Sequence, residues 1–336
     1  MFKRNMTMTL LVVLFTFSFI ILFHAPSAIA KTYKFSITLS ELSPWYQGAK
    51  MFADLVKART DGKIKIDIYP NQQLSGGNLV KGLQMLQSGA IDMAFNSSIH
   101  FSLVDPRFIV VSMPWIMPSY EAVDRVLDGP VGEELMNYCR DNKIEAIGMA
   151  GDGFRQITNN VREITKPSDL NGLRIRIPGL KMYISTFKYL GANASAMNFA
   201  ELYGALQRGA MDGQENPVST IVSAKLHEVQ KYCSLWNYSY HVIILGVNKK
   251  LWDSFDKETQ KILRETAKEV CFYERMLARK MDSDLVQTMI EKGVKVTALT
   301  QEQIEAFKPL IQPIYKEFAP IIGAELLDKF RSVGQQ

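Results

Sequence analysis

The hydrophobic positions near the start of the chain follow two different spacings. In some stretches every second residue is apolar, as in half-buried strands, and in others apolar residues recur at helical intervals of three and four. One helical stretch begins at Pro44, a residue type favoured in a first helical turn, and another stops at Gly89. The strand-like stretches are 33–39, 63–69 and 91–95, and the helical ones are 44–60 and 79–88. Strands separated by helices predict parallel pairing with crossover helices.

A second series of alternating stretches begins after Gly153. Its predicted strands are 154–158, 173–177, 194–198 and 211–214, and its predicted helices are 182–190 and 200–208. Two helices, 120–127 and 132–142, and a strand, 145–150, are predicted before it. Residues 241–247 are strand-like and are expected to carry the chain back toward the first series. Two α/β lobes predict a ligand cleft that lies at the carboxyl ends of strands and closes by hinging.

Residues 256–291 keep a helical pattern without any proline or glycine and end just before Gly293. This is much longer than the usual globular helix of roughly eight to twenty residues. The pattern predicts either one long helix that crosses both lobes or two helices with a break.

The first thirty residues have the pattern of a secretory signal peptide. Lys3 and Arg4 precede an apolar run at 10–23, and Ala28-Ile29-Ala30 supplies a small-residue cleavage pattern. The run is shorter than the roughly twenty residues of a membrane span, so an uncleaved anchor is the weaker alternative. We therefore expect cleavage after Ala30 and a periplasmic protein.

Charge and cysteine content exclude several classes of function. Removing Lys3 and Arg4 lowers the formal charge from +5 to +3, and no block of basic residues follows, so nucleic acid is not expected as a partner. Three scattered cysteines are too few for a disulfide framework or a zinc site, and buried free thiols are favoured.

Arg174 and Arg176 alternate with apolar residues just before Pro178-Gly179. In a strand both arginines would share one face, at the strand's carboxyl end. This position suits a binding site for an anion.

Several motifs resemble those of the substrate-binding proteins of tripartite ATP-independent periplasmic (TRAP) transporters, the C4-dicarboxylate-binding family. The most specific is Asp212-Gly213-Gln214-Glu215-Asn216-Pro217. The other matching stretches are 62–66, 69–70, 170–176, 191–194, 205–207 and 228–232. The similarity extends from about residue 33 to the end of the chain.

The resemblance implies a two-lobed periplasmic binding protein fold, with two α/β domains joined by crossing strands and a long helix. The implied division is 31–152 with 241–281 for lobe I, and 153–240 with 282–336 for lobe II. The implied function is capture of a small organic acid, a C4-dicarboxylate or related hydroxy or oxo acid, without a cofactor or metal. Delivery to the small and large TRAP membrane subunits, by a monomer, is expected to follow.

By the same resemblance, Arg176 pairs with the ligand carboxylate, Arg155 belongs to the same pocket, and Asn216 offers its amide to the ligand. A planar guanidinium matches a carboxylate through two parallel hydrogen bonds, which supports this assignment. Glu215 is expected to be a structural partner because a carboxylate facing the ligand would repel it. Arg174 lacks a match and is expected to be solvated or structural.

The remaining candidates are expected around this arginine pair. Phe199 matches an aromatic residue that packs over the ligand, and strand 91–95 leads to Asn96 and Ser97. Trp45 and Trp115 occupy loop positions that could wall the pocket. Core packing is the alternative for all three aromatic residues.

Two other functions remain possible on sequence grounds. A periplasmic carboxylate-processing enzyme would have to rely on carboxylates, because the familiar hydrolase, metalloprotease and phosphate-loop motifs do not occur. A ligand-sensing receptor would share the same fold and cannot be separated from a transport protein by sequence.

Overall fold

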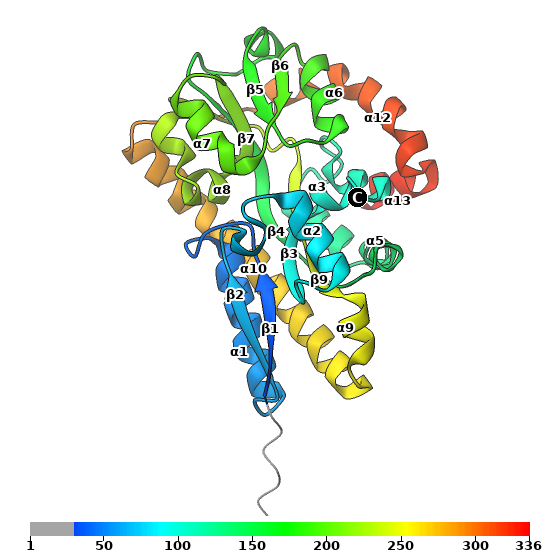
Figure 1. The fold of residues 1–336 in the computed structure, drawn as a ribbon. Helices are drawn as coiled ribbons and strands as arrows, with labels where there is room; N and C mark the ends of the chain where they lie inside the picture. Colours follow the sequence, from blue (N-terminus) through cyan, green and yellow to red (C-terminus); the bar gives the residue numbers. More distant parts are fainter. Residues whose placement is uncertain (1–29) are drawn as a thin grey trace, which may run out of the picture.

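The computed structural model describes residues 30–336, so residues 1–29 of the predicted signal peptide lie outside the described part of the chain. Strands and helices form an upper and a lower α/β lobe (Figure 1). The strands are β1 Lys31–Ser36, β2 Ile64–Tyr69, β3 Met93–Ser97, β4 Ile144–Asn159, β5 Arg174–Ile177, β6 Asn193–Ala196, β7 Gly213–Pro217, β8 Tyr232–Leu235, β9 Tyr240–Asn248 and β10 Lys295–Ala298. Across residues 30–336, no helix combines the length and apolar character required to cross a membrane.

The helices pack around these strands. They are α1 Pro44–Arg59, α2 Leu79–Ser88, α3 Ser98–Phe101, α4 Tyr120–Leu127, α5 Pro130–Tyr138, α6 Lys181–Tyr189, α7 Phe199–Gln207, α8 Val218–Ser223, α9 Lys249–Ser254, α10 Lys257–Glu291, α11 Gln301–Glu305, α12 Lys308–Ile322 and α13 Ala324–Gly334. Short 3-10 helices lie at Gln73–Ser75, Pro106–Ser112, Cys139–Asn142, Pro167–Leu170 and Leu226–Val229.

The lower lobe is built on the strand order β2-β1-β3-β9-β4. Strand β1 pairs in parallel with both β2 and β3, which confirms the parallel arrangement predicted for the first three strands. Strand β9 then runs antiparallel to β3 and to β4. The predicted return of the chain at 241–247 is therefore correct, since β9 lies in the middle of this sheet.

Strand β4 belongs to both lobes. The sequence predicted two strands, 145–150 and 154–158, but the structure has one continuous strand from Ile144 to Asn159. Its register with β9 shifts between Gly151 and Phe154, and Gly153 adopts a φ of +94° that disfavours other residues. The glycines therefore bend the strand at a bulge without ending it.

The upper lobe is built on the second half of β4. Residues Arg155 to Asn159 pair with β7 on one side, and the last three of them pair with β8 on the other. Strand β5 lies parallel to β7 and β6, so the strand order is β4-β7-β5-β6, while β10 extends β8. Both β5 and β7 end close to the boundary between the lobes (Figure 1).

Helix α10 is one unbroken helix, which settles the alternative left open by the sequence. It packs against α1 and β4 and, farther along, against α8 and β10 of the upper lobe. Its buried positions include Leu263, Val270, Ala278 and Met289. Its buried residues lie between Leu263 and Ala278 and at Met289, so it is anchored in both lobes.

Three hydrophobic clusters form the core, and the largest of them contains buried residues from both lobes. Each cluster contains one buried cysteine: Cys139 in the largest cluster, Cys271 in the cluster beneath α1 and Cys233 in the cluster beneath α7. The prediction that the cysteines are buried is confirmed.

The C-terminal helices connect the two lobes. Helix α12 packs against α6, whereas α13 packs against α4 in the lower lobe. Tyr315 donates a hydrogen bond to the carbonyl of Pro114, and Lys329 pairs with Glu134. We propose the predicted lobe boundaries as the division of the chain; α13, at the end of the 282–336 segment of lobe II, packs against α4 of lobe I.

Candidate functional site

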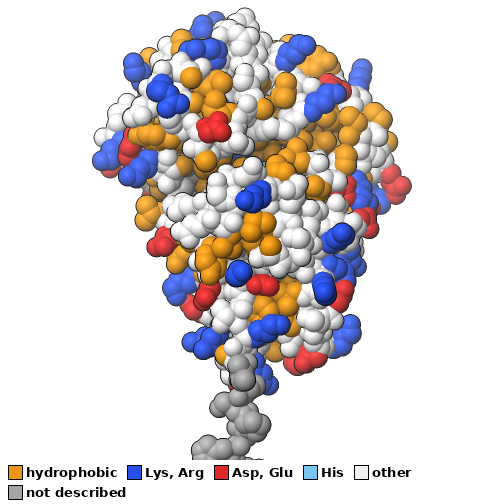
Figure 2. All heavy atoms as spheres, in the orientation of Figure 1, with side chains coloured by type: hydrophobic (Ala, Val, Ile, Leu, Met, Phe, Trp, Pro, Cys, Tyr) orange, Lys and Arg blue, Asp and Glu red, His pale blue; other side chains and the backbone are white. Residues whose placement is uncertain are grey.

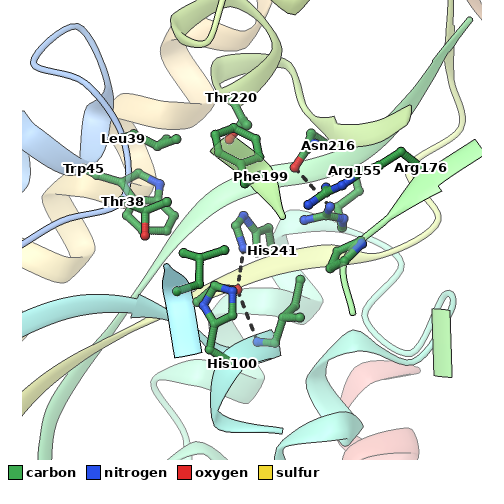
Figure 3. A pocket seen from close by; sticks show the side chains of 14 residues that line it. Thr38, Leu39, Trp45, His100, Arg155, Arg176, Phe199, Asn216, Thr220 and His241 are labelled. Atoms are coloured by element: carbon green, nitrogen blue, oxygen red, sulfur yellow. Dashed lines mark hydrogen bonds between the residues drawn. The ribbon is translucent and has the colours of Figure 1, made fainter. Parts of the chain in front are cut away.

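A cavity with an empty volume of about 410 Å³ lies where the two lobes meet. Apolar side chains gather along this boundary on the molecular surface (Figure 2). The residues that line the cavity come from both sheets and from the loops and helices that follow their strands (Figure 3). They are Thr38, Leu39, Trp45, Leu79, Ser97, Ile99, His100, Arg155, Arg176, Pro178, Phe199, Asn216, Thr220 and His241. Two lining residues are arginines, and none of the described lining residues is acidic.

Arg176 is a buried cation without a carboxylate partner among the described residues. Its side chain is 3% exposed, and its Nε and Nη2 donate to the carbonyl of Met197 at 3.0 and 2.6 Å. Burial lowers the pKa of Arg176 to about 10; nearby Glu215 opposes this and Arg155 adds to it. A desolvated, unneutralised guanidinium favours binding of an anion.

Arg155 differs from Arg176 because a buried carboxylate already neutralises it. Its Nε and Nη2 donate to the carboxylate of Glu215 at 2.5 and 2.9 Å, and both side chains are at most 1% exposed. Tyr238 also donates its hydroxyl hydrogen to Glu215. The prediction that Glu215 is a structural partner is confirmed, and this pair holds Arg155 against the cavity.

Asn216 lines the cavity beside this ion pair. Its Oδ1 accepts a hydrogen bond from Nη2 of Arg155 at 3.1 Å, and its Nδ2 donates to Oε1 of Gln214. Strand β7 places Glu215 and Asn216 next to β4, where Asn216 is opposite Gln156. The amide is thereby oriented by the neighbouring Arg155.

Phe199, Trp45 and Ser97 also line the cavity. Phe199 begins α7, and its ring centroid lies 5.9 Å from the guanidinium carbon of Arg176. Trp45 is fully buried in the first turn of α1. Ser97 ends β3 and caps α3 by accepting a hydrogen bond from the backbone of Ile99.

Two predicted site residues do not line this cavity. Asn96 precedes Ser97 on β3, and successive side chains of a strand point to opposite faces, so the two cannot both face the cavity. Trp115 packs against Trp236 and Tyr238 and donates from Nε1 to the carbonyl of Trp236. The alternative of core packing therefore holds for Trp115.

The structure adds two histidines to the predicted site. His241 lies at the start of β9, and its Nε2 is 2.7 Å from Oγ of Ser97. Burial lowers the pKa of His100 to about 3, with the charges of His241 and Arg176 contributing, so His100 is neutral at physiological pH. His241 could have been suspected from its place at the start of the predicted crossing strand, whereas Thr38 and Thr220 had no such signal.

A partly buried carboxylate lies at the bend of β4. Asp282 of α10 accepts a hydrogen bond from the hydroxyl of Tyr120 at 2.8 Å, and Gly153 lies beside it. Burial raises the pKa of Asp282 to about 7. Because this pKa is above its ordinary value, the folded protein favours the protonated form of Asp282. The resulting contribution to the free energy of unfolding is fully present below about pH 4 and is lost as the pH rises through 7.

We expect Asp282→Asn to raise the free energy of unfolding at pH 8 by about 2 kcal/mol and to have almost no effect at pH 4. Urea denaturation between pH 4 and 8 measures this difference. Asp284→Asn, on the exposed side of the same helix, is the matched control and should show no such trend. An equal gain in the free energy of unfolding at pH 4 and pH 8 would contradict the raised pKa of Asp282.

Comparison with known proteins agrees with this geometry. Residues 35–320 match the model of the bacterial extracellular solute-binding proteins, family 7, abbreviated DctP. The chain is 32% identical over 296 residues to the C4-dicarboxylate-binding periplasmic protein DctP of Rhodobacter capsulatus, covering 88% of each chain.

Two solved structures are similar over nearly their whole length. A TRAP periplasmic solute-binding protein from Ralstonia eutropha with bound (S)-2-acetolactate is 35% identical, with a TM-score of 0.86 and coverage of 90% of this chain and 98% of that one. One from Sulfurospirillum deleyianum with bound succinate is 30% identical, with a TM-score of 0.83 and the same coverage.

Proposed function

Since this chain belongs to the bacterial extracellular solute-binding proteins of family 7, we propose that the cavity between its lobes is its ligand site. The function is capture of a small organic acid outside the cytoplasmic membrane and its delivery to an ion-gradient-driven TRAP permease. The family consists of transport proteins rather than enzymes.

Arg176 is the observation that carries the assignment of the site. It is a buried cation that lines the cavity, and no described carboxylate lies within ion-pair distance of it. A ligand carboxylate would supply the missing negative charge and could accept two hydrogen bonds from the guanidinium. Arg155, held by Glu215, and the amide of Asn216 would complete the anionic end of the site, while Phe199 and Trp45 would cover the carbon chain.

The lobes are expected to close around this ligand. Arg176 and Asn216 come from the upper sheet, whereas Ser97 and Trp45 come from the lower lobe, so a ligand held by both groups favours the closed arrangement. Closure requires a hinge between the lobes, and the bend of β4 between Gly151 and Phe154 lies at the boundary between them.

The cellular setting follows from the same proposal. The chain would be exported, cleaved after Ala30, and act as a monomer with the small and large membrane subunits of the permease. A receptor role in sensing would use the same closed, liganded form. Genes for the two membrane subunits next to this one would favour transport.

A thermal-shift screen of the mature chain against small organic acids tests the proposed function. A ligand at a hundred times its dissociation constant should stabilise the protein by about 2.7 kcal/mol, which raises the melting temperature by several degrees. The protein should first be denatured and refolded, to remove any acid that co-purifies with it. No shift with any carboxylate after this step would contradict the proposal.

A further inference from the structure

A chain of buried polar contacts connects the two lobes along one side of the cavity. Oγ of Ser97 lies 2.7 Å from Nε2 of His241, and Nδ1 of His241 lies 3.5 Å from Oδ2 of Asp152. Asp152 also accepts hydrogen bonds from the hydroxyls of Ser219 and Thr220. All five side chains are more than nine-tenths buried, and Ser97 lines the cavity. His241 and Thr220 also line it (Figure 3).

The charge of the Asp152 carboxylate determines which way the neighbouring side chains direct their hydrogens. A carboxylate can only accept, so Thr220 must direct its hydroxyl hydrogen toward Asp152. Nδ1 of His241 lies 3.5 Å from the same carboxylate without a hydrogen bond between them, but the negative charge favours the ring proton on this nitrogen, which leaves Nε2 as an acceptor. Ser97 therefore donates its hydroxyl hydrogen to His241, and burial keeps the ring neutral by lowering the pKa of His241.

As a result, two hydroxyl groups in the cavity have no hydrogen left to offer a ligand. The oxygens of Ser97 and Thr220 can only accept, because their hydrogens point to His241 and Asp152. A donor is available nearby, since the buried Nε1 of Trp45 has no hydrogen-bond partner among the described residues. A ligand hydroxyl can donate its one hydrogen to either of the two oxygens and also accept from Trp45, whereas an oxo group can only accept.

A second carboxylate is poorly matched to this part of the cavity. It would face the lone pairs of Ser97 and Thr220, and burial keeps the two imidazoles there uncharged, so the single N–H of Trp45 would have to stabilise a full negative charge. Among the residues that the structure describes, the cavity lining contains no lysine and no arginine beyond Arg155 and Arg176. A buried acceptor without a donor costs affinity, so such ligands should bind more weakly.

We propose that the site selects monocarboxylates that carry a hydroxyl group, through the Asp152–His241–Ser97 chain and Thr220, over oxo acids and dicarboxylates of the same length. This inference rests on the proposed function, because Arg176 must hold the carboxylate. His241 and Asp152 act as positioning residues that orient the hydroxyls in contact with the ligand.

Calorimetry with matched acids tests this preference on the refolded mature protein. The probes are 2-hydroxybutanoate, 3-hydroxybutanoate, butanoate, 2-oxobutanoate and succinate, followed by the six-carbon acids gluconate, hexanoate and adipate. We expect a hydroxy acid to bind at least tenfold more tightly than the other acids of its length. In a Ser97→Ala/Thr220→Val double variant this preference should disappear, so that the hydroxy acid and the unsubstituted acid of the same length bind within threefold of each other.

Ser98→Ala is the matched control. Ser98 follows Ser97 in the chain, is equally buried, and its Oγ makes no hydrogen bond among the described residues, so its loss should leave the preference intact. Thermal unfolding verifies that each variant is folded. Tightest binding of an oxo acid or dicarboxylate, or an unchanged preference in the double variant, would overturn the inference and leave the proposed function standing. Failure of all eight acids to bind would overturn both.

The position of the His241 proton provides a test that does not depend on ligand affinity. Nitrogen NMR of histidine-labelled mature protein has three pairs of ring-nitrogen signals to assign, from His100, His227 and His241. We expect His241 to be neutral with its proton on Nδ1 at pH 7. A proton on Nε2 would reverse the direction of the Ser97 hydrogen bond and refute the inference.

Discussion

Arg176→Lys is expected to weaken the binding of organic acids by about 2–3 kcal/mol, although the charge at this position is retained. The planar guanidinium can hold a carboxylate through two hydrogen bonds while it donates to the carbonyl of Met197. An ammonium group has different geometry and cannot reproduce both sets of contacts. Calorimetry with an acid identified by the thermal-shift screen measures the loss.

Arg174→Lys is the natural control for this substitution. Arg174 lies two residues earlier on β5, but it is half exposed and pairs with Asp212 outside the cavity. We expect its replacement to leave the affinity within about 0.5 kcal/mol of the original, as for most surface substitutions. Equal affinities for both variants and the unmodified protein would refute the role of Arg176.

Glu215→Gln should lower the free energy of unfolding by about 3–5 kcal/mol, the largest stability change that we predict. The substitution removes the charge that neutralises Arg155, while Arg155 remains fully buried. It also weakens the hydrogen bond that Tyr238 donates to this carboxylate. Urea denaturation at pH 7 provides the measurement.

Asp212→Asn breaks an exposed ion pair from the same motif and should cost at most about 1 kcal/mol. Replacing both members of the buried pair by apolar residues, as in Arg155→Leu/Glu215→Leu, should restore part of the stability that the single substitution removes. A loss below 1 kcal/mol for Glu215→Gln would show that the Arg155–Glu215 pair is not an important constraint on the fold.

The strands, the helices and the two-lobed class could be predicted from the sequence. The spacing of apolar residues and the capping of helices depend only on residues that are close together in the chain. The long helix was visible for the same reason, as no proline or glycine interrupts residues 257 to 291. The sequence pattern was wrong about β4, where glycines at a bulge look the same as glycines that end a strand. The packing of α13 against α4 was missed because it depends on contacts between residues far apart in the chain.

The same distinction between local pattern and long-range contacts applies to the residues of the candidate site. Arg176, Arg155 and Asn216 were identified by sequence motifs, and the structure places all three on one cavity. Whether Trp45 or Trp115 lines that cavity depended on which loop reaches it, and the choice of Ser97 over Asn96 depended on the orientation of one strand.

The sequence by itself determined the family, the lobed α/β class and the cationic character of the site, since these depend on residue types and spacing. Only the tertiary structure decided that Arg155 is neutralised and Arg176 is not, because Glu215 reaches one arginine and not the other. It also brought His241 next to Ser97, across 144 positions of the chain. Charge balance and hydrogen-bond direction are properties of groups in contact, and folding determines those contacts.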